Sequence, residues 1–144
     1  MSLLAGCSFL GIGRRPQARL VSRTASVFHL TVGDCVVPPT KIQAEISTLQ
    51  VVSCRKPHTQ EVFALVQDHA GSNYPGASAL ETFANANCLQ HFQSYVGVAY
   101  EDSSLFYTFL LPSVRSWSAG DRTVACVITT TGQPLRSSVR GSKR

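Results

Sequence analysis

The sequence lacks the short motifs that mark metal centres, phosphate sites and nucleophilic enzymes. Its 144 residues contain no Cys-x-x-Cys, no His-Glu-x-x-His and no Gly-x-Ser-x-Gly. The one Gly-x-Gly, at Gly11 and Gly13, is followed by two arginines and not by the start of a phosphate-binding helix. His29 and His69 have no partner at metal-ligand spacing, and His91 falls within the apolar stripe of a predicted helix. We therefore predict no metal site and no cofactor.

Long apolar runs are also absent. Hydrophobic residues make up 44% of the chain, yet no stretch of 18 apolar residues occurs, so no membrane-spanning helix is predicted. The net charge of +5 is concentrated at the two ends, which we expect to be solvated tails; the end residues are Arg14, Arg15, Arg19, Arg23, Arg136, Arg140, Lys143 and Arg144. No basic stripe is interleaved with aromatic residues, so nucleic acid is not an expected partner.

The five cysteines are the most informative residues present. Leu-Ala-Gly-Cys, ending at Cys7, is the pattern that a lipoprotein signal peptidase recognises, and the cysteine becomes the acylated first residue of the mature protein. The other four form an even set, which in an exported domain predicts two disulfides. Only six residues precede Cys7, whereas a secretory signal needs roughly 7–15 apolar residues, so we expect the signal to begin upstream of Met1. If Met1 is the true start, Cys7 is an ordinary cysteine of a cytosolic protein, and four further thiols remain unexplained.

Three regions follow from this pattern. Residues 1–7 are the expected remnant of a lipoprotein signal, and residues 8–27 have no sustained hydrophobic period and are predicted to be a flexible basic tether. Residues 28–142 are expected to form one domain, which is long enough to bury a core. A basic tether beside a lipid anchor would also favour anionic phospholipid.

The domain is predicted to be α+β, with an antiparallel sheet of about four to five strands and one long helix packed on it. Val-rich and aromatic segments predict strands within residues 30–37, 46–54, 61–67, 105–111 and 123–129. Ser78 and Glu81 form a capping-box pattern at the start of a helix that continues to about Val96. One stripe of this helix is apolar and includes Cys88.

The same periodicity predicts how the cysteines pair. Val124, Cys126 and Ile128 share one face of the last predicted strand. A helix packed on that face brings Cys88 to Cys126, which selects one of the three possible pairings and leaves Cys35 with Cys54.

Several short signatures resemble those of the septum-formation family. The two most specific are Cys-x-x-Pro-His-x-x-Glu-Val, from Cys54 to Val62, and Ser-Trp-x-x-Gly-Asp-Arg, from Ser116 to Arg122. The resemblance covers residues 28–142. It implies an exported or membrane-anchored envelope protein of an actinobacterium, with no defined reaction.

His58, Glu61 and Asp121 are the candidates for chemistry. A histidine near a carboxylate can form an acid–base pair, but on an extended segment His58 and Glu61 point to opposite faces. Because Pro57 fixes the preceding turn, the favoured interpretation is that His58 anchors this turn or pairs with the sheet edge. Asp121 and Arg122 are expected to pin a loop around a buried Trp117; an exposed Trp117 beside Arg122 would instead form a recognition patch.

Two functions are compatible with these residues. The first is a lipid-anchored, non-catalytic accessory module on the outer face of the cytoplasmic membrane, which binds an envelope or inner-membrane protein complex with Trp117 and Arg122 as interface candidates. The second is a domain that binds or hydrolyses cell-wall material, with His58, Glu61 and Asp121 around a pocket.

Overall fold

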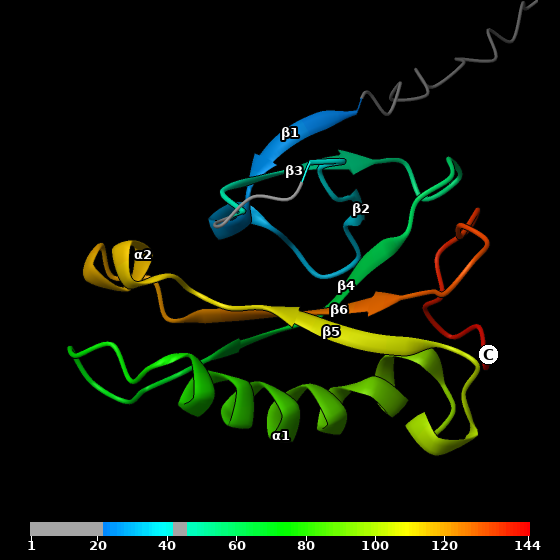
Figure 1. Cartoon of the computed structure of the whole chain (residues 1–144). Coiled ribbons are helices and arrows are strands. Elements are labelled where there is room, and N and C mark those ends of the chain that lie inside the picture. The colour runs from blue at the N-terminus through cyan, green and yellow to red at the C-terminus, as the bar shows by residue number, and fades with distance from the viewer. Residues whose placement is uncertain (1–21, 42–45) are drawn as a thin grey trace, which may run out of the picture.

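The computed structural model describes residues 22–41 and 46–144, which form an α+β fold (Figure 1). The helical and strand elements, in chain order, are β1 (Arg23–Ser26), η1 (Val27–His29), β2 (Cys35–Val37), β3 (Thr48–Val52), β4 (Gln60–Gln67), α1 (Ala77–Val96), η2 (Tyr100–Asp102), β5 (Phe106–Leu110), α2 (Val114–Ser118) and β6 (Thr123–Thr129). No helix in these two ranges has the length and apolar character needed to cross a bilayer. The predicted signal remnant, with Cys7, lies outside the described residues.

The strands form one antiparallel sheet in the order β1-β3-β2-β4-β6-β5. The sequence predicts four to five strands, and the additional strand is β1, which lies within the region predicted to be a tether. Its sequence, Arg-Thr-Ala-Ser, is too short and polar to show a strand pattern, but Ala25 pairs with Leu49 of β3 and is buried. The folded part therefore begins before residue 28, because pairing with a distant strand stabilises a segment that has little strand preference of its own.

Helix α1 has about the predicted length and packs on the sheet through the predicted apolar face. Its buried residues form the expected stripe of Leu80, Ala84, Cys88, Phe92, Tyr95 and Val96. The predicted capping box at Ser78 is wrong, because α1 begins at Ala77 and its N-cap is Gly76, which makes no side-chain hydrogen bond. At the other end, Gly97 adopts the left-handed conformation that ends a helix and donates its N–H to the carbonyl of Gln93.

The central strands β4 and β6 are buried on both faces. Helix α1 covers one face of β4, β6 and β5, whereas β1, β3 and β2 lie on the opposite side of these strands (Figure 1). Val124, Cys126 and Ile128 of β6 face α1, while the alternate residues Ala125 and Val127 pack with β1, β2 and β3. The curled sheet therefore forms a second apolar core without a second long helix.

Both predicted disulfides are present with the predicted pairing. Cys88 of α1 is bonded to Cys126 of β6, with 5.5 Å between their Cα atoms, and Cys35 is bonded to Cys54, with 5.2 Å between theirs. The first bond joins the helix to the sheet inside the core. The second joins the start of β2 to the turn after β3.

The C-terminal segment is packed against the domain and is not the solvated tail that its charge suggested. Leu135 and Val139 are buried. The N–H groups of Gly141 and Lys143 donate to the carbonyl oxygens of Tyr95 and Val96, at 2.8 and 2.9 Å. The burial of these two apolar side chains and the main-chain hydrogen bonds hold the segment on the domain, while its basic side chains remain exposed.

Candidate functional site

The structure brings His58 and Glu61 together, whereas an extended segment would have separated them. The His58 Nε2 and Glu61 Oε2 atoms are 3.9 Å apart, and both side chains are 0% exposed. The reason is that β4 begins only at Gln60, so His58 precedes the regular strand. His58 instead forms an isolated bridge with Leu135, and its Nδ1 lies 2.8 Å from the carbonyl oxygen of Lys56, which requires a proton on Nδ1.

Glu61 holds three parts of the chain together through its buried carboxyl group. Its Oε1 accepts hydrogen bonds from the hydroxyl groups of Tyr95 and Ser138, both at 2.6 Å. Its Oε2 accepts the N–H of Val139 at 2.9 Å. The carboxyl group therefore joins β4 to the end of α1 and to the C-terminal segment, which is a structural arrangement with no exposed reactive atom.

The carboxyl group also affects the titration of its tyrosine partner. Burial, assisted by the hydrogen bond to Glu61, raises the pKa of Tyr95 to about 12. An unfolded tyrosine has a pKa of about 10, so between about pH 10 and pH 12 the unfolded chain releases this proton while the folded chain retains it. We therefore expect the free energy of unfolding to fall as the pH rises through this range.

Chemical denaturation at a series of alkaline pH values tests this expectation. The fall should be smaller in Tyr95→Phe than in the unmodified protein or in Tyr74→Phe, a matched control that retains Tyr95. Some fall should remain in Tyr95→Phe, because burial also raises the pKa of Tyr107. An equal decrease in the free energy of unfolding in all three proteins would show that the titration of Tyr95 does not cause it.

Among the described residues, one group has the geometry of three metal ligands. The sulfur atoms of Cys35 and Cys54 and a carboxyl oxygen of Glu61 lie within 4.8 Å of one another. Both sulfur atoms are in a disulfide and cannot act as thiolates, so this group does not form a thiolate metal site while the bond is intact.

Asp121 lies far from His58 and Glu61. Glu61 is opposite Ile128 in the sheet, whereas Asp121 precedes Thr123, which is opposite Gln67 at the other end of β4. Six residues of strand separate the two ends by about 20 Å. The three candidates for chemistry therefore do not surround one pocket. The Asp121 carboxylate instead accepts the N–H of Thr123 at 3.0 Å.

Trp117 is buried, so it cannot contact a partner directly. It is 1% exposed, and its indole N–H donates to the carbonyl oxygen of Ser72 at 2.9 Å. The Arg122 guanidinium lies 3.9 Å from the centre of the indole ring and donates to the carbonyl oxygens of Gly71 and Trp117. Trp117 and Arg122 therefore connect the loop before α1 to α2, which confirms the predicted structural role. The predicted contact differs in one respect: Arg122 donates to the backbone carbonyl oxygen of Asp121 and not to its carboxylate.

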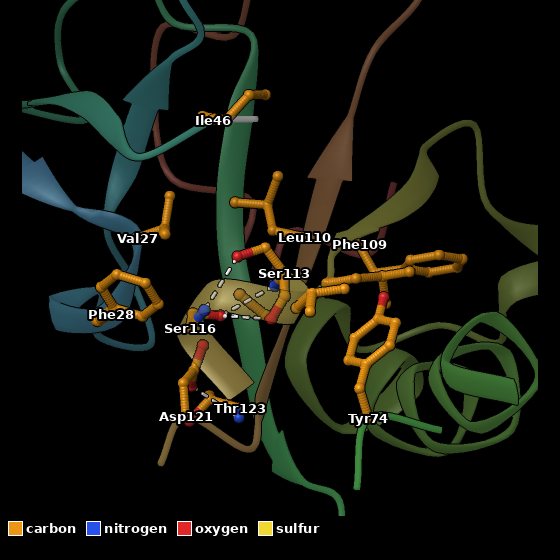
Figure 2. A pocket seen from close by; sticks show the side chains of 13 residues that line it. Val27, Phe28, Ile46, Tyr74, Phe109, Leu110, Ser113, Ser116, Asp121 and Thr123 are labelled. Atoms are coloured by element: carbon orange, nitrogen blue, oxygen red, sulfur yellow. Dashed lines mark hydrogen bonds between the residues drawn. The ribbon is translucent and has the colours of Figure 1, made fainter. Parts of the chain in front are cut away.

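A pocket lies between η1 and α2 and was not predicted from the sequence. Its volume is about 400 Å³, within the range of ligand pockets. Figure 2 shows Val27, Phe28 and Ile46 on one side and Tyr74 and Phe109 on the other. Asp121 contributes to the polar part of the lining.

Two apolar side chains at this pocket are open to solvent. Phe28 is 49% exposed and Val114, in the first turn of α2, is 61% exposed. The sequence offers little evidence for this pocket, because its two exposed apolar residues lie in short segments that are about 85 residues apart. Hydrophobic periodicity cannot show that two such segments lie side by side. We call this pocket and its two exposed side chains the apolar groove.

Comparison with known proteins gives one family and two curated relatives. The sequence model of the family described as "Septum formation" matches residues 32–142. Proteins named "Putative lipoprotein LppN", from Mycobacterium tuberculosis and Mycobacterium bovis, are each 28% identical to this chain over 127 residues. The match covers 83% of this chain and 67% of each relative. No solved structure matches the chain significantly.

Proposed function

This chain belongs to the septum-formation family, and we propose that it is an envelope lipoprotein that serves as a non-catalytic binding module of a membrane protein complex. The Leu-Ala-Gly-Cys motif and the names of the mycobacterial relatives support an acyl anchor on Cys7. The proposed location is the outer face of the cytoplasmic membrane, where the two disulfides are stable.

The apolar groove carries the binding part of the proposal. Exposed apolar side chains around a cavity are typical of surfaces that bind another molecule. The groove lies beside η1 and α2, away from the side of the domain where β1 begins (Figure 1). A domain anchored through the N-terminal segment would present the groove away from the membrane. The proposed occupant is a segment of the partner complex with at least one bulky apolar side chain.

The burial of His58 and Glu61 favours this function over hydrolysis. Neither side chain is accessible to a substrate, and Asp121 lies at the other end of the sheet. A general acid or base must come within hydrogen-bond distance of the reacting group. These residues are better explained as the connection between β4 and the C-terminal segment.

We expect the full-length protein, purified in mild detergent from its native membranes, to carry acyl mass on Cys7 and to bring down a stoichiometric membrane protein. Phe28→Asp/Val114→Asp should reduce partner recovery at least about tenfold, because the charges must be desolvated in an apolar contact. Intact-mass and quantitative mass spectrometry measure the two results.

Leu89→Asp is the matched control, because Leu89 is 47% exposed but lies on α1 and not in the groove. It should leave partner recovery unchanged. An unmodified Cys7 would contradict the anchor. Equal recovery with the groove variant and the wild type would contradict the binding surface.

A further inference from the structure

Most of the basic residues of the described chain gather at one end of the domain. Seven of them are exposed there, and we call this surface the basic end: Arg23, Arg55, Lys56, Arg136, Arg140, Lys143 and Arg144. In sequence they come from three separate regions. Given the proposed lipid anchor, we propose that the basic end binds anionic phospholipid headgroups and sets the orientation of the domain on the membrane.

Backbone contacts bring these regions together. The turn that carries Arg55 and Lys56 is joined to the C-terminal segment by the two-way hydrogen bonding between His58 and Leu135, at 3.0 and 2.8 Å. Arg136 follows directly. Arg23 pairs with Val51, just before the same turn.

The rest of the basic end is held by contacts with α1 and its surroundings. The Arg140 guanidinium lies 4.8 Å from the centre of the Tyr95 ring, and the Lys143 N–H bonds the carbonyl oxygen of Val96. The Ser103 hydroxyl donates to the main-chain carbonyl oxygen of Arg144. The charges are thus carried by an ordered surface, so binding would order less backbone than a free tail requires.

Few carboxylates offset this charge. Asp34 pairs with Arg23 at 3.0 Å, and Glu61 is buried. Glu101 and Asp102 are exposed in η2, next to Ser103. The net exposed charge of this end is therefore positive. Among the residues described by the structure, Arg23 is the only one of the seven basic residues that forms a salt bridge.

The path of the chain favours a membrane as the partner. Figure 1 shows β1 beginning on the same side of the view as the C-terminus, so the described chain starts on the side of the basic end. Cys7 and Ser22 are 15 positions apart in the sequence, which limits their separation to about 50 Å, and three of the residues between them are arginines. Clusters of four to eight Lys or Arg close to a membrane are typical of anionic-lipid binding.

The test uses the chain from residue 7 onward with Cys7→Ser, so that no lipid is attached. Its co-sedimentation with phosphatidylcholine vesicles that contain phosphatidylglycerol is compared with that with phosphatidylcholine alone. Binding should require phosphatidylglycerol and should weaken as salt shortens the Debye length below about 8 Å. Lys56→Gln/Arg136→Gln should lower the partition coefficient about 25-fold, on the basis of about fivefold for each cation near the surface.

Lys41→Gln/Arg115→Gln is the control, because it removes the same charge from exposed residues outside the basic end. It should change the partition coefficient less than about twofold. Equal losses with the two double variants, binding that is independent of phosphatidylglycerol, or binding to duplex DNA without binding to vesicles would each overturn the proposal. The acyl mass on Cys7 is not measured in this assay, so failure of the lipid anchor and failure of the basic end give different results.

Discussion

Glu61→Ala is expected to lower the free energy of unfolding by about 3–5 kcal/mol. Tyr95 and Val139 would retain buried donors without an acceptor, each costing about 1–3 kcal/mol, and the missing side chain would leave a cavity. Ser138 is exposed, and its hydroxyl can bond to water instead. Urea denaturation of the oxidised protein measures this loss. Amide exchange should also become faster at Val139, because its N–H loses its acceptor.

Glu61→Gln is the control that separates the hydrogen bonds from the volume of the side chain. Both hydroxyl donors bond the same carboxyl oxygen, which the amide oxygen of glutamine can replace. Only the N–H of Val139 would then face an amide NH₂, so the loss should be about 1–2 kcal/mol. A loss below about 1 kcal/mol in Glu61→Ala would show that this carboxyl group does not hold the C-terminal segment.

Cys88→Ala/Cys126→Ala is expected to destabilise the protein by about 4 kcal/mol, because it releases a loop closed across a sequence separation of 38 residues. Cys35→Ala/Cys54→Ala opens a separation of 19 residues and should cost about 3 kcal/mol. The first pair is also fully buried in the core between α1 and β6, so its loss removes packing as well as a cross-link.

Equilibrium denaturation under non-reducing conditions compares the two double variants with the intact protein. A reductant added to the intact protein should lower its stability to below that of either double variant. A larger loss for Cys35→Ala/Cys54→Ala would contradict both the loop-length argument and the assignment of the buried bond to the core.

The elements that the sequence predicted correctly have a signal within one segment. The apolar stripe of α1 repeats with the helical period, and the alternation in β6 repeats every two residues. These two patterns also indicated the pairing of Cys88 with Cys126, because a buried stripe must pack on a buried strand face. Burial of Trp117 followed from the usual role of a tryptophan beside a turn.

The remaining features depend on segments that lie far apart in the sequence. Strand β1 has no strand pattern and forms only because β3 is available to pair with it. The approach of His58 to Glu61 depends on β4 beginning only at Gln60 and on the bridge between His58 and Leu135. The C-terminal segment is basic, but two buried apolar residues and the carboxyl group of Glu61 hold it in place.

The α+β class, the long helix, five of the six strands of the described sheet, the disulfide pairing and the family could therefore be predicted from the residues, because each has a periodic or local signal. The positions of the candidate sites depend on how distant segments pack together, and they could not be predicted in this way. The apolar groove joins η1 to α2, and the basic end joins three separate regions of the chain. The groove depends on the curl of the sheet, and the basic end depends on the packing of the C-terminal segment. Both are long-range contacts that no local pattern of residues encodes.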